Sequence, residues 1–299
     1  MRSLLFVPGD SPRKLAKALG AGADVLLLDL EDSVAADAKV AARRSVRDFL
    51  REAKAERDGP ALYVRINALS SGLSEGDLDE VMVAGPDGVM LPKCEGRDDV
   101  ALLDSRLAVR EALHGLGDGA TRILPIATET PAALFGMSGY RGSSPRLAGL
   151  AWWAEDLAAA IGAGANMDAD GSWLPPFSLA RNLCLFAAAA ARVAAIDTVF
   201  TDYRDLGGLK READAAARDG FTGKLAIHPD QVPIINEAFT PSDAAVMHAR
   251  RILAAFAEAG DAGVVGLEGA MLDRPHLEAA RRLLARAGEG KDTTERTDR

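Results

Sequence analysis

Cysteine is scarce in this chain of 299 residues. Its two cysteines, Cys94 and Cys184, stand far apart and form none of the paired spacings that bind zinc or build a disulfide framework. Such sparing use of cysteine is typical of proteins from a reducing compartment, so we expect a cytoplasmic location. The apolar run in the N-terminal MRSLLFVPGD is too short for a signal peptide, which favours the same expectation.

Basic residues are also fewer than acidic ones, with 35 Lys and Arg against 44 Asp and Glu. The formal net charge is -9 at pH 7 and the isoelectric point is about 5.1. Nucleic-acid binding needs a net basic face, so this balance argues against a nucleic-acid partner. No uncharged apolar stretch reaches the length of a membrane span, and we therefore expect no membrane partner.

Motifs of several common enzyme classes are missing. Dinucleotide-binding sheets carry G-x-G-x-x-G after their first strand, whereas the corresponding turn here reads VPGDSPRK. No G-x-S-x-G motif of serine hydrolases occurs, and the four histidines lack the H-x-x-x-H spacing of zinc enzymes. One of them, His228 in AIHPDQ, is either a neighbour of the active site or a turn-stabilising residue beside Pro229.

What the chain does have is an alternation of short β-like runs with longer helical ones. A hydrophobic content of 48% allows a substantial core, and the alternation is typical of parallel α/β architecture. Eight runs predict strands: 3–7, 25–30, 61–66, 88–91, 122–127, 147–152, 195–200 and 224–227. Helices are predicted between them, among others at 12–19, 38–55, 98–113, 178–194 and 209–218. Eight strands favour a (β/α)8 barrel over a doubly wound open sheet, whose glycine fingerprint is missing.

The pattern changes near the end of the chain. Helices are predicted at 229–239, 242–259 and 275–287, and the segment GDAGVVGLEGAMLD is expected to be a loop. We therefore divide the chain into a barrel domain (1–229), a helical lid or oligomerisation region (230–288) and a frayed polar tail (289–299).

Glu129 and Asp156 follow consecutive predicted strands, and each precedes a predicted helix start. The carboxyl ends of barrel strands open on one face, where polar residues indicate chemistry. Two carboxylates delivered there can hold one hard divalent cation. The alternative is a pair of helix-start acids favoured by the helix dipole.

Other charged residues also follow predicted strands. Arg65 in VRIN stands where a fixed guanidinium would enter the barrel mouth, or where it would pair structurally with Asp29 or Glu31. In DLEDSV, Glu31 and Asp32 lie where they could hydrogen-bond the waters of a metal ion, although Asp32 could equally cap a helix.

Eight motifs, in this order, resemble the citrate lyase β-subunit and malyl-CoA lyase family. They are LLFVPGDSPRKLAKA, VLLLDLEDSV, VRIN, LPK, TETP, AEDLAAAIGA, GFTGKLAIHPDQVPIINEAFTPS and GAMLDRPHLEAARRLL, and they cover nearly the whole chain. The resemblance implies a magnesium-dependent (β/α)8 barrel, with manganese as a possible substitute. It also implies a homotrimer or homohexamer that makes or breaks a carbon–carbon bond between a 2-oxo acid and the acyl group of a CoA thioester.

The resemblance assigns roles to individual residues. Glu129 and Asp156 match the metal ligands, and Arg65 matches an arginine that contacts substrate. Asp273 matches a lid aspartate that is supplied across a subunit interface for proton transfer; its alternative role is an ordinary N-cap before Pro275.

CoA phosphates must find a local basic patch on an acidic protein. Arg13 and Lys17, in the first turns of the helix after VPGD, are the candidates for CoA binding, and a solvated charged face is the alternative. Lys93 in LPK would lie near the ligand or pair with Glu129.

One position departs from the family. Trp153 in LAWWAEDLA stands where relatives commonly have glycine, a few residues before the metal aspartate. We expect its ring to shape the choice of the 2-oxo acid.

The sequence thus predicts a lyase for malyl-, citramalyl- or citryl-CoA. Three alternatives are a thioesterase of malyl-CoA type, a metal-dependent 2-oxo acid aldolase that acts without CoA, and a subunit of a citrate lyase complex that is either noncatalytic or dependent on an acyl carrier protein.

Overall fold

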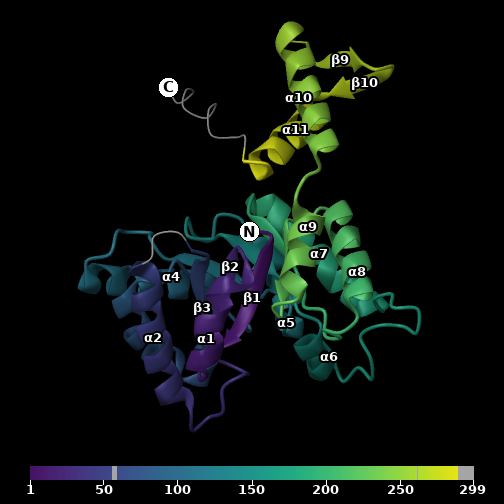
Figure 1. Ribbon diagram of the computed structural model, residues 1–299. Helices are drawn as coiled ribbons and strands as arrows, with labels where there is room; N and C mark the ends of the chain where they lie inside the picture. Colours follow the sequence, from purple (N-terminus) through teal and green to yellow (C-terminus); the bar gives the residue numbers. More distant parts are fainter. Residues whose placement is uncertain (56–58, 261, 289–299) are drawn as a thin grey trace. The chain divides into compact units, whose positions relative to one another are not determined.

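The computed structural model describes residues 1–55, 59–260 and 262–288, and the predicted polar tail (289–299) lies outside them. The chain divides into two compact units after Asn236, within helix α9 (Gln231–Phe239) (Figure 1). The sequence placed this boundary slightly earlier, after residue 229. In the described part of the chain no helix is long and apolar enough to cross a membrane.

The first unit is built around eight parallel strands. They are β1 (Ser3–Pro8), β2 (Val25–Asp29), β3 (Ala61–Arg65), β4 (Gly88–Leu91), β5 (Arg122–Pro125), β6 (Gly149–Ala151), β7 (Ala194–Asp197) and β8 (Gly223–Ala226). Their order is β5-β4-β3-β2-β1-β8-β7-β6. Two isolated parallel bridges, Ile123 to Leu147 and Ile126 to Ala151, join the edge strands β5 and β6. The sheet therefore closes on itself, and the predicted (β/α)8 barrel is confirmed.

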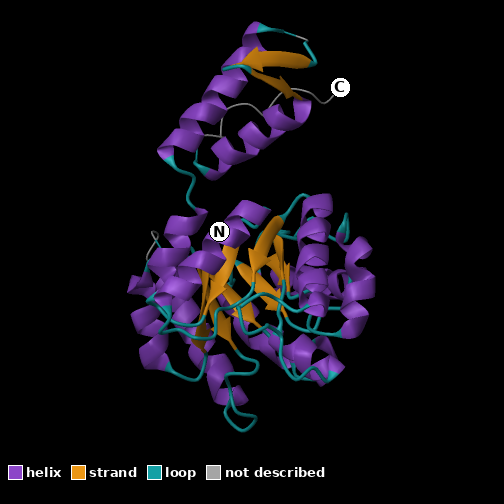
Figure 2. Ribbon diagram, turned by 90° about the vertical axis from the view of Figure 1, so that its right-hand side faces the viewer, coloured by secondary structure: helices purple, strands orange, loops and turns teal. Residues whose placement is uncertain are grey.

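Helices surround these strands (Figure 2). They are α1 (Pro12–Ala18), α2 (Lys39–Ala55), α3 (Ser74–Val81), α4 (Arg97–His114), α5 (Pro131–Gly136), α6 (Glu155–Ile161), α7 (Pro175–Ala191) and α8 (Leu206–Asp219). Short 3-10 turns are η1 (Leu19–Ala21), η2 (Leu69–Ser71), η3 (Met82–Ala84) and η4 (Met137–Tyr140). Every residue of β2 is buried, as expected for a parallel strand covered on both faces.

Alternation along the strands decides which side chains enter the barrel. Val25 and Leu27 of β2 and Tyr63 of β3 belong to the central apolar cluster. Because side chains on one face recur every second residue, Asp29 and Arg65 continue these inward rows at the strand ends. The two residues are also direct partners in the β2–β3 register. The fold thus delivers an acid and a guanidinium together to the barrel mouth.

Gly9 holds the turn after β1 close to the neighbouring strand. Its backbone N–H donates to the Asp29 carbonyl oxygen at 2.9 Å. A Cβ atom at position 9 would lie 2.6 Å from that oxygen and 2.8 Å from Val46 Cγ2. Glycine is therefore required here by close approach, whereas its backbone angles are ordinary.

The second unit has its own small core. It contains α10 (Asp243–Glu258), α11 (Arg274–Arg286) and the antiparallel strands β9 (Val264–Leu267) and β10 (Ala270–Asp273). The two helices predicted for this part of the chain are present, but the expected loop GDAGVVGLEGAMLD was wrong: most of it is this β-hairpin. Glu268 and Gly269, with φ of 52° and 82°, form its tight turn, as two-residue hairpin loops require.

Candidate active site

Charged side chains from β2, β3, β4, β5 and β6 gather at the carboxyl end of the barrel. Arg65 is the fixed cation of this group. Its Nε and Nη2 each donate to one carboxylate oxygen of Asp29 at 2.7 Å, and its Nη1 lies 3.0 Å from Glu31 and 3.6 Å from Asp32. The structural ion pair considered for Arg65 therefore exists, and the Nη1 edge remains directed at the acids that follow β2.

The three carboxylates at the end of β2 and just after it, Asp29, Glu31 and Asp32, differ in their environment. Although burial disfavours ionisation of Asp29, the hydrogen bonds and charge of Arg65 hold the pKa of Asp29 below its ordinary value. Burial raises the pKa of Glu31 despite the nearby cations. Asp32 is largely exposed. Asp29 is thus committed to Arg65, Glu31 is buried next to Arg65 and Lys93, and Asp32 is open to solvent.

Glu129 stands in the loop between β5 and α5, and its carboxylate is buried. The Lys93 backbone N–H donates to Glu129 Oε2, but Oε1 has no hydrogen-bond partner in the described ranges. Burial, together with the charges of Glu31 and Asp156, raises the pKa of Glu129 to about 8. A buried carboxylate with an unpartnered oxygen is costly unless a cation compensates it.

Asp156 lies in the first turn of α6, so the helix dipole favours its charge, as the alternative interpretation expected. It also faces the site: its Oδ1 lies 3.6 Å from Lys93 Nζ, and its charge acts on Glu129. The neighbouring Glu155 contacts Asn166 instead, at 3.5 Å. The structure thus brings Asp156, rather than Glu155, together with Lys93.

Lys93 follows β4 and links these acids. Its ammonium lies 2.5 Å from Glu31, and this hydrogen bond outweighs the effect of burial and raises the pKa of Lys93. The sequence predicted either proximity to the ligand or a pair with Glu129. The structure shows that the backbone of Lys93 contacts Glu129 while its side chain contacts Glu31.

Two aromatic rings flank Arg65. The guanidinium carbon lies 4.8 Å from the ring centre of Phe6 and 5.9 Å from that of Trp153, and the two rings meet edge to face at 5.6 Å. Trp153 is therefore part of the barrel mouth. The sequence analysis missed Phe6, although Phe6 continues the inward row of Leu4 on β1, which is the signal that would have found it.

The remaining expected residues lie elsewhere. Arg13 and Lys17 are exposed on α1, and neither has an ion-pair partner within the described part of the chain. His228 is partly exposed and stacks on Tyr203, with its Nδ1 accepting from the Asp230 backbone N–H at 3.3 Å. This contact fits the turn-stabilising alternative.

Asp273 belongs to the second unit, where it immediately precedes α11. Its carboxylate is exposed and lies 2.5 Å from His276 Nδ1, a contact that lowers the pKa of Asp273. Both the capping position and an accessible carboxylate are therefore present at this residue.

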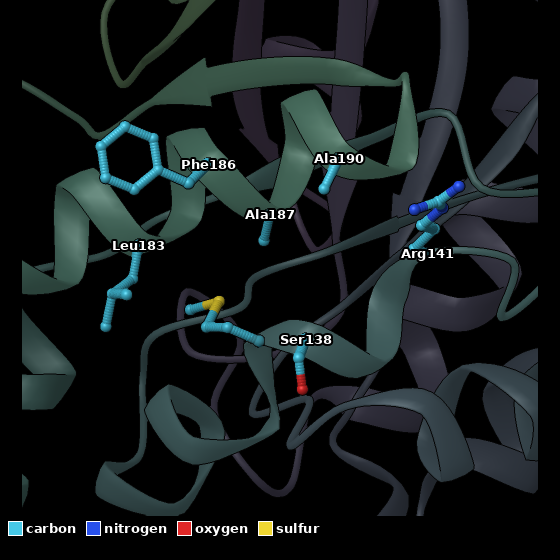
Figure 3. Close-up of a pocket in the computed structure, with 7 residues that line it drawn as sticks. Ser138, Arg141, Leu183, Phe186, Ala187 and Ala190 are labelled. Atoms are coloured by element: carbon cyan, nitrogen blue, oxygen red, sulfur yellow. The ribbon is translucent and has the colours of Figure 1, made fainter.

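A separate apolar cavity of about 230 Å³ lies between η4 and α7. Figure 3 shows Leu183, Phe186, Ala187 and Ala190 on one side of it and Ser138 and Arg141 on the other. None of the residues expected at the site lines this cavity. Among the residues that line it there is no carboxylate and no histidine that could activate the Ser138 hydroxyl, whereas the barrel mouth gathers several carboxylates.

Comparison with known proteins finds similarity over almost the whole chain. Residues 2–229 match a family described as HpcH/HpaI aldolase/citrate lyase, and residues 180–289 match one described as C-C bond lyase of the TIM-barrel fold. A citrate lyase subunit beta-like protein of Mycobacterium tuberculosis is 37% identical over 285 residues, which is 95% of either chain. A (3S)-malyl-CoA thioesterase of Cereibacter sphaeroides is 33% identical over 290 residues, 96% of this chain and 94% of its own.

A solved structure is similar over almost the whole chain. It is the protein CitE of Mycobacterium tuberculosis in complex with magnesium, acetoacetate and coenzyme A. The match covers 97% of this chain and 100% of the CitE chain, with 35% sequence identity and a TM-score of 0.76.

Proposed function

Since the chain belongs to the HpcH/HpaI aldolase/citrate lyase family, we propose that it is a magnesium-dependent lyase of CoA thioesters. Its substrate would be a 3-hydroxyacyl-CoA such as malyl-, citramalyl- or citryl-CoA. Cleavage breaks the bond between the α and β carbons and yields a 2-oxo acid and acetyl-CoA or a related acyl-CoA. The reverse reaction forms this bond from the same two compounds. The observation that carries the proposal is the buried Glu129 carboxylate beside Asp156 at the barrel mouth.

The residues present fit a magnesium ion. Glu129 Oε1 is buried without a hydrogen-bond partner among the described residues, and Asp156 is close enough to raise the Glu129 pKa. No group of three or more His, Cys, Asp or Glu side chains in the described ranges is arranged to hold a metal. Magnesium suits such a site because it is commonly held by one or two carboxylates and keeps waters or substrate oxygens in its other positions. Manganese has similar ligand preferences.

A bound magnesium ion would stabilise the negative charge that develops on oxygen when the carbon–carbon bond breaks. Arg65, held rigid by Asp29, presents Nη1 toward Glu31 and Asp32 and would orient the substrate carboxylate or carbonyl oxygen. Glu31 and Asp32 would accept hydrogen bonds from waters around the ion. These side chains come from neighbouring strand ends, so the barrel fixes their positions before substrate binds.

The proton has to be exchanged with the α carbon of the acyl group. Asp273, exposed and ahead of α11, would exchange it, with the second unit of one subunit serving the barrel of another in a homotrimer or homohexamer. Arg13 and Lys17 would bind CoA phosphates from the exposed face of α1. The CoA thioester and the 2-oxo acid are thus the proposed small-molecule partners.

A thioesterase is the second candidate, because the similar protein of Cereibacter sphaeroides carries that name. Water would then attack the thioester carbonyl, and free CoA would be released together with the intact hydroxy acid. The same acidic group and Arg65 would bind the substrate in either case.

One assay separates the two candidates. Purified protein is incubated with Mg²⁺ and each of malyl-, citramalyl- and citryl-CoA, and free CoA, acyl-CoA and 2-oxo acid are quantified separately. Lyase chemistry yields acyl-CoA and 2-oxo acid in equal amounts, and both should vanish with EDTA or in Glu129→Gln. Free CoA without 2-oxo acid indicates hydrolysis, while no turnover of any thioester contradicts the proposed function.

A further inference from the structure

Lys93 has a backbone conformation that few residues other than glycine adopt. Its φ is 51°, in the left-handed region, where side chains with a Cβ are disfavoured and which often marks functional sites. This backbone conformation allows the main chain and the side chain of Lys93 to contact different acids. The backbone N–H donates to Glu129, while the side chain turns toward Glu31, 2.5 Å away, and Asp156, 3.6 Å away.

The charge balance around Lys93 is uneven. Glu31, Asp32, Glu129 and Asp156 all act on this one ammonium, with Asp32 at 4.0 Å. Arg65, the other cation of the group, is nearly fully buried and is clamped by Asp29 through two hydrogen bonds. Lys93 is one-third exposed and sits on a flexible stem, so its charge can move while that of Arg65 cannot.

We propose that the Lys93 ammonium is the counter-cation of this acidic group in the absence of metal. It interacts with both Glu31 and Asp156, and a divalent ion that binds Asp156 displaces it from that carboxylate. The inference rests on the proposed metal site at Glu129 and Asp156. Two cations that compete for one carboxylate lower each other's affinity, since each loses part of its electrostatic attraction. Lys93 therefore weakens magnesium binding and keeps the acids close together before the ion arrives.

A neutral side chain at position 93 removes this competition. Lys93→Met keeps the length of the side chain and leaves the backbone contact with Glu129 in place. We expect Mg²⁺ to bind this variant about fivefold more tightly, the order expected for one partly screened charge a few ångströms away. Lys93→Arg keeps the charge and should retain the wild-type affinity.

Isothermal titration calorimetry with Mg²⁺, at fixed pH and ionic strength and without any substrate, measures these affinities directly. The matched control is Lys54→Met. Lys54 pairs with Asp87 at 2.8 Å near the amino end of β4, so this variant loses one positive charge away from the acidic group. It should bind Mg²⁺ like the wild type. Circular dichroism monitors folding, and Lys93→Gln replaces the methionine variant if that variant does not fold.

The outcomes separate this inference from the proposed function. Unchanged or weaker Mg²⁺ binding in the neutral variants overturns the role of Lys93, even if Glu129→Gln abolishes binding and so supports the metal site. Equal binding by the wild type and Glu129→Gln, or none by the wild type, overturns the metal site and with it the role of Lys93. Tighter binding in both Lys93→Met and Lys54→Met also contradicts a local effect of Lys93.

Discussion

The carboxylate of Glu129 lies buried beside Glu31 and Asp156, and these surroundings raise its pKa to about 8. In the unfolded chain the same group titrates near its ordinary value of 4.5. Between these two values the folded, metal-free protein therefore holds one proton more than the unfolded chain at this residue. Linkage then requires that its stability decreases as pH rises through this window.

The expected decrease of stability with rising pH can be tested on the protein in EDTA, where no metal is bound. The free energy of unfolding of the wild type should fall between pH 5.5 and 8.5, by roughly 1–3 kcal/mol relative to Glu129→Gln, which cannot ionise there. Urea denaturation at several pH values measures both proteins. Parallel pH profiles for the two would contradict the raised pKa.

Trp153 gives a second prediction at the level of single residues. Its ring borders Arg65 and Phe6, so Trp153→Gly would widen the space beside the guanidinium. We expect the ratio of kcat/KM values for two 2-oxo acids of different size to change by about tenfold, the order that contacts in an apolar pocket contribute. The condensation rate with acetyl-CoA measures this ratio for glyoxylate, pyruvate and oxaloacetate. An unchanged preference would exclude Trp153 as a determinant.

At the scale of elements, a buried polar network fixes the end of β6. Trp152 Nε1 donates to Asp197 at the end of β7, at 2.7 Å. Asp197 also accepts from Lys224 of β8 at 2.8 Å and lies 3.3 Å from Arg181 of α7. Both Asp197 and Lys224 are almost fully buried, so each charge depends on its partner.

Asp197→Ala should therefore be strongly destabilising. It leaves Lys224 buried with Glu212 as its one remaining ion-pair partner among the described residues, and we expect the free energy of unfolding to fall by about 3–5 kcal/mol. The control is Asp219→Ala, which removes the exposed partner of Arg181 and should cost no more than about 1 kcal/mol. Urea denaturation compares the two, and similar losses for both would argue against the network.

The strands of the barrel could be predicted from the sequence, whereas the hairpin of the second unit could not. The eight strands were predicted within a few residues because each is an apolar run between longer helical segments. The hairpin of β9 and β10 was missed because its strands are short and half exposed, which leaves little hydrophobic pattern. Its turn at Glu268–Gly269 was the available signal, since a residue pair ending in glycine suits a tight hairpin.

At the scale of the whole molecule, the resemblance read from eight motifs is confirmed by the family match, and so is the expected enzyme class, a carbon–carbon lyase. The two units fold around separate apolar cores. In our proposal, catalysis needs a barrel from one subunit and Asp273 from another.

Mixing two inactive variants tests whether one subunit donates Asp273 to the barrel of another. Glu129→Gln and Asp273→Asn should each be nearly inactive alone. Mixed oligomers formed by co-expression should recover about a quarter of wild-type activity, because random assembly pairs an intact barrel with an intact Asp273 at one site in four. The lyase assay on affinity-purified mixed oligomers measures the recovery. Its absence, in oligomers shown to be mixed, would contradict donation of Asp273 across subunits.

By itself, the sequence determined the barrel, the acids at its mouth and the family. These follow from local patterns: apolar runs set the strands, and a polar residue just after a strand must appear at the carboxyl end of a parallel barrel. Only the tertiary structure decided how the charges pair. Asp29 meets Arg65 through strand register, whereas Lys93 reaches Glu31 because its backbone turns into the left-handed region. Such contacts join residues distant in sequence, so packing rather than local pattern selects them.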